Sequence, residues 1–157
     1  KFYLRAAASS TLKDVYAKVE RIVEASAMAM GAKGSMKPYQ NWVENMVPTP
    51  SFDAVYAKNL SLFGETAEPA GERLMGSTDI GNVSQVVPAI QPTINISDEP
   101  IKGHSKEMVA ACSQKGLDSI LLGAKVLAFT ALDLIREPET LKKIKEEHKY
   151  EVEHQAD

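Results

Sequence analysis

The segment that most constrains the fold is residues 117–135, which are apolar nearly all the way round a helix. A helix without a polar face is normally buried on every side, so we expect this one to pack against a broad β-sheet. Lys125 and Asp133 interrupt the run, and its apolar part is too short to cross a bilayer. The segment therefore predicts a globular protein with a buried helix and no membrane association.

The first part of the chain has the pattern of a small α+β layer. Residues 1–6 and 37–47 are short stretches typical of strands, and residues 12–30 between them repeat apolar side chains at helical spacing. Thr11 and Asp14 fit a capping box at the start of this helix. A strand, a helix and a strand form a sheet too narrow to bury a core alone, so we expect other strands to complete it.

The sequence divides into two units, residues 1–47 and residues 48–157, because prolines and a change in character follow the second expected strand. In the second unit, residues 51–62 predict a helix and residues 86–96 predict a strand. Pro138 is suited to the first position of a final helix, where a missing N–H does no harm.

Composition excludes several classes of function. The 157 residues carry a formal net charge of -3 without a clustered basic face, so no nucleic-acid partner is expected. No basic leader followed by an apolar run is present, which favours a cytoplasmic location. The single cysteine, Cys112, lies beside alanines and predicts a small buried residue and not a nucleophile. The sequence starts at Lys1 inside an expected strand, as a cut fragment would.

Residues 75–84 are dense in glycine and small hydroxyl side chains, a composition more typical of a site loop than of a helix. Ser77 and Thr78 with Asp79 offer hydroxyls beside a carboxylate, but no GxSxG elbow surrounds them. The alternative interpretation is a tight turn with hydrogen-bonding side chains.

The chain has three histidines. His104 stands between Gly103 and Ser105 at an expected turn before a helix, and it is a candidate metal ligand. His148 and His154 lie in the charged C-terminal helix and tail, where we expect solvent exposure. A catalytic zinc site needs about three protein ligands. No HxxxH, HxD or CxxC pair supplies the others.

These motifs together resemble a known family. Residues 75–84, followed by a Val-Pro pair, resemble the second-half signature of the amidohydrolase branch of the aminoacylase and carboxypeptidase G metallopeptidases. The run is most similar to that of aminobenzoyl-glutamate hydrolase and the aminoacylase-like dipeptidases, whereas hippurate hydrolases have a glutamate where Thr78 stands. The turn at His104 resembles the late histidine of the family, and residues 124–139 resemble its closing helices.

The resemblance implies an α/β fold. Residues 48–157 are then the C-terminal part of a zinc-peptidase-like catalytic domain, in which helices pack on a sheet. Residues 1–47 are the C-terminal half of a ferredoxin-like α+β lid or dimerisation domain. This relationship also implies a homodimer formed through the lid.

The same resemblance implies a metal-dependent site. In such enzymes two divalent metal ions, zinc or manganese, share a bridging water and lower its pKa. His104 corresponds to a metal ligand of the family. The residues implied to contact the substrate or to orient the metal ligands are Ser77, Thr78, Asp79, Asn82, Arg5 and Asn45.

The implied activity is hydrolysis of an amide bond in an N-acyl amino acid, a dipeptide or aminobenzoyl-glutamate. The early HxD motif and the paired glutamates of the family, which supply most metal ligands and the base, have no counterpart in this sequence. We therefore expect the chain alone to contain no catalytic residue, to bind no metal ion and to be inactive. The alternative is a non-enzymatic oligomerisation module, or a partial enzyme that another chain completes.

Overall fold

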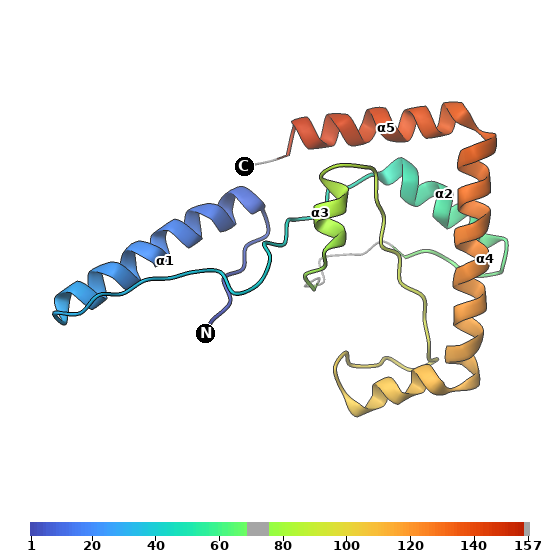
Figure 1. The fold of residues 1–157 in the computed structure, drawn as a ribbon. Helices are drawn as coiled ribbons and strands as arrows, with labels where there is room; N and C mark the ends of the chain where they lie inside the picture. The colour runs from blue at the N-terminus through green and yellow to red at the C-terminus, as the bar shows by residue number, and fades with distance from the viewer. Residues whose placement is uncertain (69–75, 156–157) are drawn as a thin grey trace.

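In the computed structural model, which describes residues 1–68 and 76–155, the regular elements are all helices (Figure 1). In chain order they are α1 (Ser9–Ala29), α2 (Pro50–Ser61), α3 (Ile80–Ser84), the 3-10 helix η1 (Lys106–Cys112), α4 (Gln114–Arg136) and α5 (Pro138–Glu153). No strand occurs in these residues, so the expected α/β fold with helices packed on a sheet is wrong.

The segments expected to be strands, residues 1–6, 37–47 and 86–96, have no regular structure. A strand exists only as one side of a hydrogen-bonded ladder. In the described part of the chain, no main-chain hydrogen bond joins any two of these segments. Residues 37–47 instead run back beside α1 (Figure 1). The pattern correctly indicated non-helical backbone, but a ladder also needs a partner that these residues do not provide.

α1 begins earlier than the predicted capping box. Its N-cap is Ala8 and no side chain caps it, so the assignment of Thr11 with Asp14 is wrong. The helix ends as predicted by its glycine, because Gly31 adopts a left-handed φ of 67° that terminates the turn. No residue of α1 is buried, and within residues 1–68 and 76–155 it packs on no other helix.

The core lies between α2 and α4. Tyr56 and Leu60 of α2 pack with Val126 of α4, and half-buried side chains complete the cluster: Phe63, Ile90 and Leu122. α5 begins at Pro138 as predicted and buries Ile144. Because α4 contacts α2, η1 and α5, it is the central element of this part of the chain (Figure 1).

α4 contains the helix predicted over residues 117–135, but its expected burial on all sides is wrong. Only Gly116, Val126 and Thr130 are buried. The large apolar side chains that are at least half exposed are Leu117, Ile120, Leu121, Leu127, Leu132 and Ile135. Since no sheet forms, neighbouring helices cover one side of α4 and the other side stays open. Among the helices described, none has the length and hydropathy that a membrane span requires.

Candidate functional site

A polar hollow of about 560 Å³ lies where four parts of the chain meet. The start of α1, residues 44–45, the region of α3 and the end of α5 converge there (Figure 1). Its polar lining includes Ser9, Lys13, Glu44, Asn45, Asn82 and Gln155. Two residues predicted to contact the substrate, Asn45 and Asn82, are therefore brought together, although they are far apart in the sequence.

Asn45 connects the start of α1 to the end of the chain. Its Oδ1 accepts a hydrogen bond from Ser9 N at 3.1 Å, and its own main-chain N–H donates to Ser9 Oγ at 3.2 Å. Its Nδ2 donates to Gln155 Oε1 at 3.1 Å and to the Met46 carbonyl at 3.3 Å. The polar atoms of this side chain thus have partners within the protein, which gives Asn45 a structural role.

Gln85 and Gln155 form a pair of amides at the base of this arrangement. Gln155 Nε2 donates to Gln85 Oε1 at 2.9 Å, and Gln85 Nε2 donates to the Asn45 carbonyl at 2.9 Å. Both side chains are half-buried, so their amide groups need partners inside the protein. Sequence reasoning missed both glutamines, because a single amide side chain carries no recognisable motif.

Asn82 holds the chain that returns from α1. Its Oδ1 accepts from Glu44 N at 3.3 Å and its Nδ2 donates to the Trp42 carbonyl at 3.1 Å, so the side chain takes the place of a ladder partner. Beside it, Gly81 is buried against the same backbone. A Cβ at Gly81 would lie 2.9 Å from the Glu44 carbonyl carbon and closer still to its oxygen. Only glycine permits this approach.

Arg5 and Ser77 were both predicted near the substrate, and they contact each other: Arg5 Nη1 donates to Ser77 Oγ at 3.0 Å. Thr78 Oγ1 accepts a hydrogen bond at 3.4 Å from a main-chain N–H at the start of α3. Asp79 is the N-cap residue of α3 and is exposed. These side chains therefore lie around the beginning of α3, on the surface.

The small-residue run at 75–84 is part loop and part helix. Residues 76–79 are non-helical, as predicted, but the remainder forms α3, so the expectation of a loop is wrong there. Met75 lies outside the described residues. α3 buries only Gly81 and Ser84. Contacts with the chain before α2 hold this short helix in place, which composition alone does not reveal.

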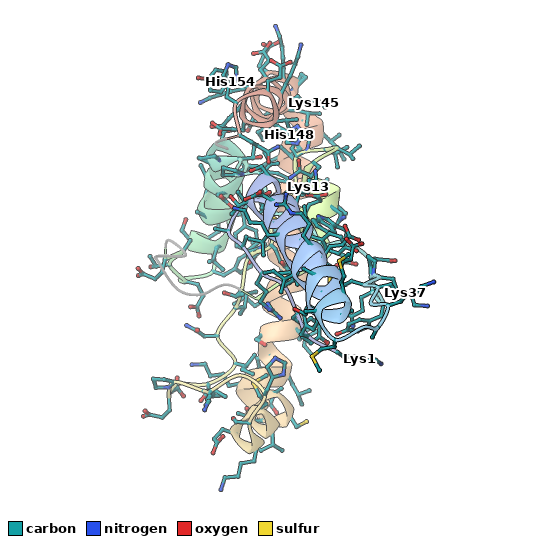
Figure 2. The ribbon with its side chains drawn as sticks, turned by 90° about the vertical axis from the view of Figure 1, so that its left-hand side faces the viewer. Lys1, Lys13, Lys37, Lys145, His148 and His154 are labelled. Atoms are coloured by element: carbon teal, nitrogen blue, oxygen red, sulfur yellow. The ribbon has the colours of Figure 1, made fainter. Side chains whose placement is uncertain are left out.

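The expected solvent exposure of His148 is wrong, because this residue of α5 is only 7% exposed (Figure 2). Its Nε2 donates to the Ser84 carbonyl at 2.6 Å, and Ser84 Oγ in turn accepts from Val47 N at 2.9 Å. The sequence contained a signal, since His148 follows the buried Ile144 by one helical turn and shares its face. His154, by contrast, is exposed as predicted.

His104 lies in the turn before η1, with an exposed side chain and a left-handed φ of 58°. η1 is well separated from α3, so the structure does not bring this histidine to the other predicted site residues (Figure 1). In residues 1–68 and 76–155, no group of three or more His, Cys, Asp or Glu side chains is placed to hold a metal ion. These residues do not fit a two-metal centre. Cys112, predicted to be buried, is exposed at the end of η1.

Comparison with known proteins indicates the class first. The chain is similar to dipeptidases over 153 residues, which are 94% of its length. These relatives are the Xaa-Arg dipeptidase of Homo sapiens, at 35% identity, and that of Mus musculus, at 32%. The aligned part is 35% of each relative, so the chain spans about a third of their length. No protein-family model matches the chain.

This similarity supports the peptidase part of the resemblance noted in the sequence. It favours dipeptide hydrolysis among the activities considered. The more specific resemblance to aminobenzoyl-glutamate hydrolase stays a prediction.

Proposed function

We propose that this chain is part of a metal-dependent peptidase that hydrolyses the amide bond of a dipeptide. The observation that carries this proposal is the similarity along 94% of the chain to two Xaa-Arg dipeptidases. The arrangement of Arg5 beside Ser77 and of Asn45 beside Asn82 supports it, because residues from distant segments meet around one polar hollow.

The chemistry of such an enzyme is hydrolysis by a water molecule that metal ions activate. The described residues of this chain supply at most His104 to such a centre, so other residues of the complete enzyme must provide the remaining ligands and the base. We propose that the chain contributes substrate contacts and one side of the cleft.

We expect the purified 157-residue chain to show no dipeptidase activity, even with added zinc or manganese. A catalytic zinc needs about three protein ligands, and the described residues hold no group of three candidates. Release of free arginine from Ala-Arg, followed by chromatography, measures this, with the human Xaa-Arg dipeptidase as the positive control. Turnover above a metal-only blank that a chelator abolishes would contradict the prediction.

The complete gene product that contains this sequence tests the proposed function itself. It should cleave Ala-Arg, and His104→Ala should remove most of that activity while leaving the circular-dichroism spectrum unchanged. His154→Ala is the matched control, because that histidine is equally exposed but corresponds to no ligand of the family. Failure of the complete protein to cleave any dipeptide would refute the proposed function.

We also propose that the protein forms a homodimer through residues 1–47. α1 supports this, because it has no buried residue and exposes Ile22, Met28 and Met30. Light scattering after size exclusion over a tenfold dilution should show a dimer or larger species, and Ile22→Lys should weaken it. Leu121→Lys on the open side of α4 is the control for an unrelated apolar contact. A sharp monomer peak with cooperative unfolding would favour the non-enzymatic alternative.

A further inference from the structure

Most polar side chains around the hollow are already engaged with one another. The side-chain nitrogens of Asn45, Asn82 and Gln85 each donate to a protein oxygen. Gln155 donates to Gln85 and to the Val152 carbonyl. A ligand could use these amides only by breaking existing hydrogen bonds, and a broken bond leaves a polar group unsatisfied. The amides therefore frame the hollow and do not select what enters it.

Two charged side chains of opposite sign also line the hollow, Glu44 and Lys13. Among the residues that the structure describes, neither charged group takes part in an ion pair. Glu44 is half-buried and Lys13 is exposed. Figure 2 shows Lys13 near the start of α1, at the end of that helix that lies toward α5. One free anion and one free cation at the same hollow suit a ligand that carries both charges.

The backbone of Glu44 is held on both sides. Its N–H donates to Asn82 Oδ1 at 3.3 Å, and its carbonyl lies against Gly81 with no room for a Cβ between them. The carboxylate thus extends from a fixed point, so less conformational freedom is lost when it binds a partner. Lys13 is placed by the regular backbone of α1.

We infer that this hollow binds the C-terminal residue of a cationic dipeptide, with Glu44 pairing with the guanidinium and Lys13 with the terminal carboxylate. The inference rests on the proposed dipeptidase function and names the residues that set its specificity. A carboxylate matches the fork of a guanidinium with two parallel hydrogen bonds. An ammonium acts as a point charge and suits a carboxylate on a mobile peptide end.

Calorimetric titration of the 157-residue chain with three probes tests this inference: Ala-Arg, Ala-citrulline and Ala-Arg amide. Citrulline keeps the shape of arginine without its charge, and the amide removes the terminal carboxylate. The native chain should bind Ala-Arg about tenfold more tightly than either analogue, which corresponds to about 1.4 kcal/mol. Glu44→Gln should abolish only the preference over Ala-citrulline, and Lys13→Gln only the preference over the amide.

Matched variants separate recognition from folding. Glu44→Asp keeps the charge and should retain part of the preference, whereas Glu24→Gln removes an exposed carboxylate elsewhere on α1 and should change nothing. Thermal unfolding of each variant checks that the fold is kept. Equal binding of Ala-Arg and Ala-citrulline by the native chain, an unchanged preference in Glu44→Gln, or no dipeptide binding at all would overturn the inference.

The complete gene product distinguishes this inference from the proposed function. If it cleaves Ala-Arg but Glu44→Gln leaves the ratio of kcat/KM for Ala-Arg and Ala-citrulline unchanged, the function stands and the role of Glu44 is refuted. If it cleaves no dipeptide while the chain still binds Ala-Arg through Glu44, recognition stands and the dipeptidase function fails.

Discussion

Gly81→Ala is expected to lower the free energy of unfolding by about 3 kcal/mol, the upper end of what overpacking usually costs. The added Cβ would lie 2.9 Å from the Glu44 carbonyl carbon and nearer to its oxygen. Main-chain atoms cannot rotate away as a flexible side chain can, so α3 must shift from residues 44–45. That shift should also break the hydrogen bonds of Asn82 to Glu44 N and the Trp42 carbonyl.

Urea unfolding followed by circular dichroism measures this change. Gly103→Ala is the matched control, because no described atom lies within 4 Å of a Cβ at that position and its φ is not left-handed. It should alter the free energy of unfolding by less than about 0.5 kcal/mol. If both variants unfold at the native urea concentration, the close packing of α3 on Glu44 is refuted.

Val126→Ala is expected to cost about 2 kcal/mol, through lost burial of apolar groups at ~0.8 kcal/mol each and the cavity left behind. Val126 is 0% exposed and packs with Tyr56 and Leu60 in the core between α2 and α4. Leu127→Ala removes more atoms from the next position of the same helix, yet it should cost less than about 0.5 kcal/mol. The reason is that Leu127 is 57% exposed.

The two variants should be compared by the same urea titration, with equal slopes as the check on a common unfolding transition. Alanine favours the helix in both cases, so the difference between them reports burial and not propensity. Equal losses at Val126 and Leu127 would mean that α4 is covered on both sides in solution, as the sequence pattern predicted.

The sequence predicted the helices well, because a helix is a local structure. Apolar spacing predicted α1, α2 and α4, and Pro138 marked the first residue of α5. Each depends on hydrogen bonds between residues four apart and on side chains that recur every turn. The glycine signal at Gly31 was likewise sufficient, since a left-handed residue ends a helix wherever the rest of the chain lies.

The strands and the burial of α4 were not predictable in this way, because both depend on residues far along the chain. Residues 1–6 and 37–47 have strand-like sequences, but a ladder needs a second segment in register, and Asn82 binds Trp42 and Glu44 instead. The apolar surface of α4 predicted burial on every side, but burial requires a neighbouring element, and the described chain covers only one side.

The same distinction holds for the candidate site. The sequence alone identified Asn45, Asn82, Arg5 and Ser77 as residues of interest, through the motifs of a family. Only the tertiary structure decided that Asn45 and Asn82 share a hollow, that His148 is buried against Ser84, and that His104 lies elsewhere. Residue type and spacing determine which hydrogen bonds a side chain can make, whereas packing between distant segments determines which of them it does make.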